Sequence, residues 1–144
     1  MKIIKIKSES ETVKFAKQLA SKLRGGQIIA LQGDLGAGKT TLTKFLAKEL
    51  GVKKHITSPT FVLMKVYPIN KPSLSITKLV HVDCYRLEDP QELFYLGIEE
   101  YLNHEGRLVV IEWADKIKNY LNKFKNIIWI TIEIKDQQRI FKIK

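Results

Sequence analysis

Hydrophobic and polar residues follow two periods along the chain, one typical of strands and one typical of helices. Residues 2–7 (KIIKIK) are rich in isoleucine and predict a short strand. Ser8 and Glu11 follow with the spacing of a capping box, which predicts the start of a helix. The pair Gly25 and Gly26 predicts where this helix ends. Its apolar face would consist of four residues spaced three or four apart, namely Val13, Ala16, Ala20 and Leu23.

Two short apolar runs predict strands that are buried on both faces. They are IIAL at 28–31 and LVVI at 108–111. The first run leads directly into Gly33, and a helix is predicted after it from about Gly38 to Leu50, ending at Gly51.

The other segments also read as short elements. We predict a strand pair at 61–67 and 79–85 joined by a polar, proline-bearing loop, a helix opened by Asp89 and Pro90, a helix through 117–124, a strand at 127–135, a turn at 136–137 and a last strand to Lys144. Helices that alternate with buried strands predict an α/β sandwich with a partly parallel sheet. No internal repeat or linker divides the chain, so we expect one domain over residues 1–144.

The composition narrows the class of protein. A hydrophobic fraction of 44% in 144 residues can form one core and argues against disorder. The apolar runs are much shorter than a membrane span, and the first residues lack the features of a secretion signal. Cys84 is the only cysteine, which excludes an internal disulfide and suits a reducing compartment. We therefore expect a cytoplasmic protein without membrane contact.

The formal net charge of +10 comes mainly from lysines that are scattered along the chain. Lysines that neutralise phosphates would give salt-sensitive binding to RNA. An ordinary solvated surface rich in lysine explains the same charge. The charge therefore suggests an acidic partner or RNA nearby and leaves both explanations open.

Residues 33–40 (GDLGAGKT) have the spacing of a phosphate-binding loop, G-x-x-x-x-G-K-[ST]. Its glycines allow successive backbone N–H groups to point at an anion, and the following helix directs its positive end to the same place. Lys39 would supply charge to the β- and γ-phosphates, and Thr40 a hydroxyl ligand to Mg²⁺. We predict nucleotide contacts from nine consecutive residues, namely Gly33, Asp34, Leu35, Gly36, Ala37, Gly38, Lys39, Thr40 and Thr41. The predicted fold is accordingly the three-layer P-loop NTPase sandwich with a mixed, partly parallel central sheet.

Two acids and a tryptophan are candidates to complete this site. Glu112 follows the apolar strand LVVI, where a P-loop protein has its magnesium carboxylate. Trp113 comes next and would either stack on the nucleotide or belong to the core. Asp83 lies in the predicted strand HVDCYR, where Asp is disfavoured. It would orient the attacking water, hold a magnesium-bound water, or pair structurally with Arg86 or His81.

The segment TSPTF at 57–61 lies between the P-loop helix and the next predicted strand. In P-loop switch proteins this interval contacts the γ-phosphate, so Thr57 or Thr60 could sense it here. An ordinary Ser-Pro turn is the alternative.

The ordered set GDLGAGKT, TSPTF, HVDCYRL and VVIEW resembles the TsaE (YjeE) family, and DPQELFYLGIEEYL fits its helical segment. TsaE-like proteins are bacterial ATPases that act with the TsaB–TsaD heterodimer to form threonylcarbamoyladenosine beside the tRNA anticodon. The resemblance implies ATP with Mg²⁺, phosphate and metal contacts from Lys39 and Thr40, and a metal role for Glu112. It also implies an important acid at Asp83 and a switch-like loop that contains Thr60. By the same resemblance, the residues near Ser10 and Thr12 would lie by the base.

The implied reaction is hydrolysis of ATP to ADP and phosphate, with Lys39, Mg²⁺ and loop N–H groups stabilising negative charge. Arg86 is a candidate arginine finger, and a chain without a complete clamp would turn over slowly until a partner completes it. A small-molecule kinase is one rival, although the chain has only four arginines and no spare length for an acceptor-binding insertion. A non-enzymatic RNA-binding module is the other rival, and it would not need the phosphate loop.

Overall fold

The computed structural model describes residues 1–71 and 75–144. Part of the predicted loop between 67 and 79, residues 72–74, therefore lies outside the described residues. Elements occur in the order β1 (Lys2–Ile6), α1 (Glu9–Ala20), β2 (Ile28–Gln32), α2 (Lys39–Glu49), β3 (Met64–Pro68), β4 (Lys78–Asp83), α3 (Gln91–Tyr95), η1 (Ile98–Glu100), β5 (Arg107–Glu112), η2 (Ala114–Ile117), α4 (Lys118–Leu121), β6 (Ile127–Lys135) and β7 (Gln138–Ile143), where η marks a 3₁₀ helix.

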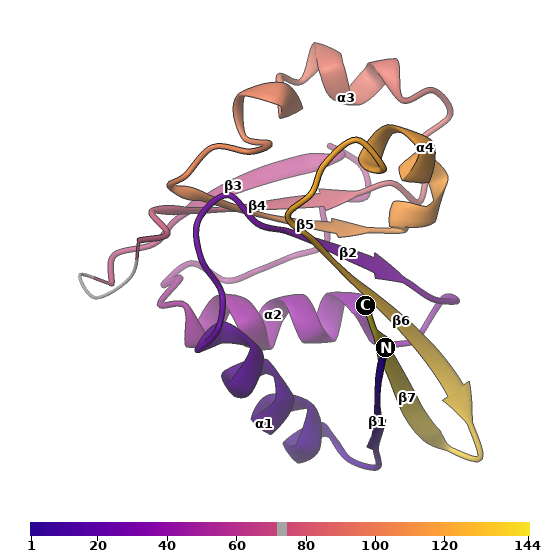
Figure 1. Ribbon diagram of the computed structural model, residues 1–144. Helices are drawn as coiled ribbons and strands as arrows, with labels where there is room; N and C mark the ends of the chain where they lie inside the picture. Colours follow the sequence, from indigo (N-terminus) through magenta and orange to yellow (C-terminus); the bar gives the residue numbers. More distant parts are fainter. Residues whose placement is uncertain (72–74) are drawn as a thin grey trace.

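Among the described residues, seven strands form one sheet in the order β1-β7-β6-β2-β5-β4-β3. Strands β6, β2, β5 and β4 are parallel to their neighbours in this group, while β1, β7 and β3 pair antiparallel at the two edges. Helices α1 and α2 cover one face of the sheet, and α3 and α4 cover the other (Figure 1). The predicted three-layer α/β sandwich with a mixed, partly parallel sheet is confirmed.

The central strand β2 shows why its sequence is apolar throughout. Its residues Ile29 and Leu31 belong to the core under α1 and α2, whereas Ile28 and Ala30 belong to the core on the opposite face. All four side chains are fully buried, as predicted for a strand covered on both sides.

The start of α1 confirms the predicted capping residue. The Ser8 hydroxyl accepts a hydrogen bond from the Glu11 N–H at 3.2 Å, and the Glu11 carboxylate accepts one from the Lys7 N–H at 2.6 Å. The helix ends at Ala20 rather than at the glycine pair. Leu23 therefore lies beyond the helix, although it is buried as predicted.

Two predicted strands are too long. The segment predicted at 61–67 becomes a strand only at Met64, because Leu63 has a left-handed φ of 63° and Phe61 is 82% exposed. The segment predicted at 79–85 ends at Asp83, where the Asp83 Oδ1 atom accepts the Tyr85 N–H at 2.9 Å. That side-chain bond replaces the hydrogen bond that a neighbouring strand would supply.

Three further predictions concern where helices and turns begin and end. The helix predicted through 117–124 is a 3₁₀ turn followed by the short α4, which ends at Leu121. Helix α3 has Pro90 as its cap residue, and the Asp89 carboxylate accepts the Gln91 N–H at 2.9 Å. The turn at 136–137 is confirmed, with positive φ at both residues, as a tight hairpin requires.

Candidate nucleotide-binding site

The phosphate loop lies between the carboxyl end of β2 and the start of α2. Gly36 and Gly38 have φ of 78° and 106°, which L side chains rarely adopt. A Cβ atom on Gly33 would lie 2.4 Å from the Ile132 carbonyl oxygen, so the loop passes directly against β6. The predicted glycines thus allow the turn and a close approach to the neighbouring strand.

Lys39 is 4% exposed and extends back across its own loop. Its ammonium donates to the carbonyl oxygens of Gly33 at 2.6 Å and Asp34 at 2.9 Å, and it lies 3.9 Å from the Trp113 ring centroid. Burial lowers the pKa of Lys39, and the surrounding carboxylates of Glu112, Asp83, Asp115 and Asp34 oppose this shift. A buried ammonium at the mouth of the loop can bind a phosphate group.

Thr40 and Glu112 meet next to Lys39. The Thr40 hydroxyl donates to the Glu112 Oε2 atom at 2.7 Å, and Glu112 is the last residue of β5. A hydroxyl and a carboxylate oxygen side by side are donors that Mg²⁺ prefers, so these residues fit the ion that the family resemblance implies. The structure thus brings these two residues, both predicted from the sequence, into contact.

Asp83 ends β4 and is paired with Glu112 in the strand register. It is 3% exposed, and its Oδ2 atom accepts hydrogen bonds from Ser58 and Thr60, each at 2.8 Å. The alternative in which Asp83 pairs with Arg86 or His81 is wrong, since the Arg86 guanidinium lies over the Phe61 ring and His81 contacts Glu112. Asp83 therefore joins the segment 57–61 to the end of β4.

The remaining predicted residues lie at different places around the phosphate loop. Trp113 lies against Lys39 and the ring of Tyr85, 5.0 Å between ring centroids, and shares a cavity of about 160 Å³ with the loop. Thr12 is buried and lines a cavity of about 90 Å³ with Thr41 and Arg139. Ser10 is exposed, and the Thr57 hydroxyl accepts a hydrogen bond from Lys65 at 2.6 Å instead of contacting Asp83.

The other residues of the phosphate loop differ in exposure. Asp34 and Leu35 are exposed, and Ala37 is buried.

Sequence reasoning missed three contacts of the site. His81 bonds to Glu112 at 2.7 Å, Ser58 bonds to Asp83, and Arg139 from β7 donates to the Ala37 carbonyl oxygen at 3.0 Å. Alternation places His81 and Asp83 on one face of a strand, which was a usable signal for the first contact. No sequence signal connects Arg139 with a loop 102 residues earlier.

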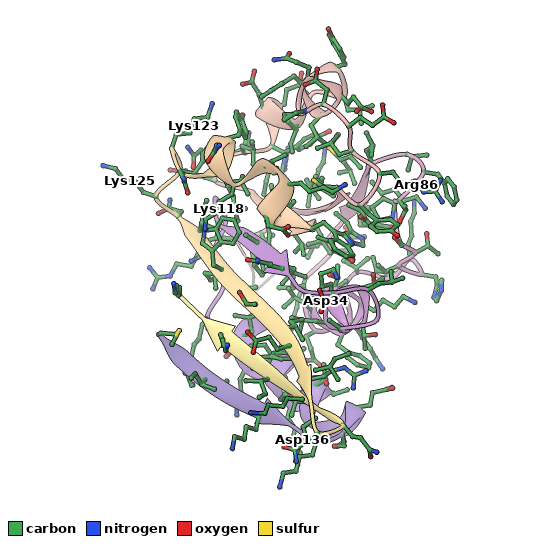
Figure 2. All side chains as sticks on the ribbon, turned by 90° about the vertical axis from the view of Figure 1, so that its right-hand side faces the viewer. Asp34, Arg86, Lys118, Lys123, Lys125 and Asp136 are labelled. Atoms are coloured by element: carbon green, nitrogen blue, oxygen red, sulfur yellow. The ribbon has the colours of Figure 1, made fainter. Side chains whose placement is uncertain are left out.

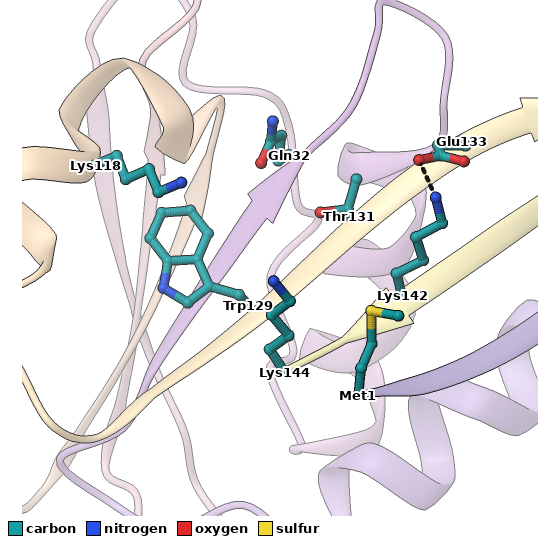
Figure 3. A pocket seen from close by; sticks show the side chains of 8 residues that line it. All are labelled: Met1, Gln32, Lys118, Trp129, Thr131, Glu133, Lys142 and Lys144. Atoms are coloured by element: carbon teal, nitrogen blue, oxygen red, sulfur yellow. Dashed lines mark hydrogen bonds and ion pairs between the residues drawn. The ribbon is translucent and has the colours of Figure 1, made fainter.

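A separate pocket of about 280 Å³ lies over β6 and β7 and contains no residue of the loop 33–40. Figure 3 shows Lys118 and Lys144 beside the Trp129 indole, with Lys142 paired to Glu133 farther along. Figure 2 shows that Lys123 and Lys125 lie on the same side of the molecule as Lys118, away from Asp34.

None of the helices within residues 1–71 and 75–144 is long and apolar enough to cross a membrane.

The protein is a P-loop-type α/β protein. Three features define this class here: the sheet order, the glycine loop between β2 and α2, and the buried lysine.

A family model described as "Threonylcarbamoyl adenosine biosynthesis protein TsaE" matches residues 6–141. The chain therefore belongs to the TsaE family, which takes part in the biosynthesis of threonylcarbamoyladenosine in tRNA.

Individual relatives agree with this assignment. The chain is 40% identical to the "tRNA threonylcarbamoyladenosine biosynthesis protein TsaE" of Rickettsia typhi over 141 residues, 96% of this chain and 92% of the relative. It is also 40% identical to the protein of the same description from Bacillus subtilis over 111 residues, 77% of this chain and 65% of the relative. The crystal structure of Bacillus subtilis YdiB superposes with a TM-score of 0.77 and 30% identity, covering 99% of this chain and 83% of the other.

Proposed function

We propose that the chain binds ATP with Mg²⁺ at the loop 33–40 and hydrolyses ATP to ADP and phosphate in support of threonylcarbamoyladenosine formation. The observation that carries this proposal is the contact between three elements at one end of the sheet. Lys39 lies buried at the mouth of the loop, and Thr40 at the start of α2 contacts Glu112 at the end of β5.

The loop and the start of α2 supply fixed positive partial charge for the phosphates. Backbone N–H groups of the loop would hold the phosphate oxygens, and Lys39 would exchange its contacts with Gly33 and Asp34 for the β- and γ-phosphates. Thr40 and Glu112 would hold Mg²⁺, which neutralises charge on the phosphates when it is bound. Arg139, which bonds to Ala37, adds a second cation at the edge of the same cavity.

In this proposal Asp83 orients the attacking water. It is the last residue of β4, which runs parallel to β5, and it lies opposite Glu112; its carboxylate accepts hydrogen bonds from the Ser58 and Thr60 hydroxyls. The water attacks the γ-phosphorus, the bond to the bridging oxygen breaks, and ADP leaves. Arg86 lies on Phe61, so we do not assign it the role of an arginine finger. We therefore expect slow turnover until a partner completes the site.

The partner that we propose is the TsaB–TsaD heterodimer, as the family resemblance implies. The hydrogen bonds from Ser58 and Thr60 to Asp83 join a largely exposed loop to the end of β4, opposite Glu112. A change at the γ-phosphate could therefore alter a surface that the partner contacts, and partner affinity would depend on the nucleotide. A role in tRNA modification supports a cytoplasmic location.

Nucleotide titration of three variants tests the phosphate site. Lys39→Ala should weaken ATP binding about 10- to 100-fold, since a hydrogen bond to a charged group contributes about 1.5–3 kcal/mol. Thr40→Ala should chiefly damage magnesium-dependent hydrolysis. Lys44→Ala, an exposed lysine on the same helix, is the matched control. Unchanged ATP affinity in Lys39→Ala would overturn the assignment, and phosphate transfer to a metabolite instead of water would favour the kinase.

A further inference from the structure

Three buried or half-buried side chains form a continuous hydrogen-bonded chain beneath the phosphate loop. Thr40 Oγ1 donates to Glu112 Oε2 at 2.7 Å, and the other carboxylate oxygen, Oε1, lies 2.7 Å from His81 Nε2. His81 is 0% exposed and Glu112 is 2% exposed. The proposed function uses Thr40 and Glu112 but gives His81 no role.

The contact fixes which ring nitrogen carries hydrogen. An ionised carboxylate only accepts hydrogen bonds, so Nε2 of His81 is the donor. The other nitrogen, Nδ1, is buried and has no hydrogen-bond partner in the part of the chain that the structure describes. The imidazole is therefore directed at a single group, the Glu112 carboxylate.

Strand geometry explains why this pair forms. His81 and Asp83 lie two residues apart on β4 and face the side of the sheet that α2 covers. Glu112 is opposite Asp83 in the parallel register, so its carboxylate lies between the two β4 side chains and the start of α2. A buried carboxylate needs donors for both oxygens, and His81 and Thr40 supply one each.

We propose that His81 is a positioning residue that holds Glu112 with its Oε2 atom directed at Thr40 and thereby sets the affinity of the site for Mg²⁺. The inference rests on the proposed magnesium site. Without the imidazole, Oε1 is buried without a donor, and the carboxylate turns away from Thr40. Groups that orient a metal ligand in this way typically change metal affinity 10- to 100-fold when they are removed.

The experiment measures ATP binding, rather than hydrolysis, at a series of Mg²⁺ concentrations. His81→Leu removes the donor and keeps most of the volume, and His81→Gln returns an amide N–H near the place of Nε2. His81→Asn is polar but too short to reach the carboxylate. Val80→Ala is the matched control, because Val80 is equally buried on the same strand and faces the opposite core. Thermal unfolding of every variant separates stability from metal binding.

Mg²⁺ should raise ATP affinity in the wild-type protein. The Mg²⁺ concentration that gives half of this effect should be about tenfold higher in His81→Leu and His81→Asn. His81→Gln and Val80→Ala should need close to the wild-type concentration, and ATP affinity in EDTA should be equal in all of them. In a Glu112→Gln background, His81→Leu should add nothing further. Should His81→Leu fail to fold, the comparison of the Asn and Gln variants decides.

Two results would overturn the inference. One is a folded His81→Leu or His81→Asn protein with wild-type Mg²⁺ dependence, and the other is a loss in His81→Gln as large as in His81→Asn. A wild-type protein whose ATP affinity does not respond to Mg²⁺ would instead overturn the proposed magnesium site itself, and this inference with it.

Discussion

At the scale of single residues, Cys84 shows how closely the end of β4 is packed. Its side chain is fully buried, and its N–H donates to the Glu112 carbonyl oxygen at 3.0 Å. Burial, followed by the nearby Asp83 charge, raises the pKa of the Cys84 thiol to about 12. Because the thiolate is the reactive form, the thiol should be inert in the folded protein.

We predict that a thiol reagent at pH 8 labels Cys84 only after the protein opens, and rapidly in denaturant. The raised pKa also favours folding below the unfolded-state pKa near 9, and this contribution is lost as pH rises toward about 12. The free energy of unfolding should therefore fall from about pH 9 upward, and fall less in Cys84→Ala. Rapid labelling of the native protein would contradict the packing described here.

Asp83 is the other residue whose contacts make a sharp prediction. Thr60→Val removes one hydroxyl that donates to Asp83 and keeps the shape of the side chain. A hydrogen bond contributes about 1 kcal/mol, so amide exchange in residues 57–62 should be about fivefold faster. Thr57→Val is the control, because its hydroxyl contacts Lys65 instead. Equal exchange in Thr60→Val and wild type would mean that Asp83 does not hold the segment 57–61.

At the scale of elements, the position of the phosphate loop depends on how closely it passes β6. Gly33→Ala would bring a Cβ atom to 2.4 Å from the Ile132 carbonyl oxygen, so loop and strand must move apart. Gly36→Ala meets nothing within 4 Å and adds only the strain of its φ of 78°, about 1–2 kcal/mol. We predict a larger loss of stability and of ATP affinity in Gly33→Ala, measured by denaturant unfolding and nucleotide titration. Comparable losses would show that β6 does not constrain the loop.

The order and type of most elements could be predicted because their patterns are local. IIAL is apolar on both faces, GDLGAGKT opens a helix, and Ser8 caps one. The errors occur where one side chain replaces a regular backbone bond, as at Asp83, or where a left-handed residue interrupts a strand, as at Leu63. Such events depend on single contacts that no periodicity records.

In the candidate site, too, some residues could be predicted from the sequence and some contacts could not. Lys39, Thr40 and Glu112 could be predicted because each follows from a motif or from the end of an apolar strand. The contacts of His81 and Arg139 depend on strand register and on the return of β7 to the loop, and one sequence contains neither. The assigned roles themselves remain predictions for the variants described above.

At the scale of the whole molecule, the charge of +10 has two explanations, RNA binding and a solvated surface, and only RNA binding requires an affinity for tRNA that falls with salt. If RNA binds, the pocket in Figure 3, where Trp129 lies beside Lys118 and Lys144, offers an aromatic ring and positive charge to a base and its phosphates. Lys118→Glu with Lys144→Glu should weaken tRNA binding more than Lys14→Glu with Lys17→Glu, which makes the same charge change on exposed positions of α1. Gel-shift titration at several salt concentrations measures this. Equal losses would attribute the binding to overall charge.

The order of strands in the sheet has a consequence for how the protein is made. Strand β2, which leads into the phosphate loop, is flanked by β5 and β6, and Arg139 of β7 touches the loop across 102 residues. While the ribosome is still adding residues before β5, the loop and α2 have emerged, but β2 has neither of its neighbours. Long-range strand pairing is slow and leaves apolar strands exposed until it is complete. The nascent chain should therefore be vulnerable to proteases and need chaperone protection until β5, β6 and β7 have left the exit tunnel.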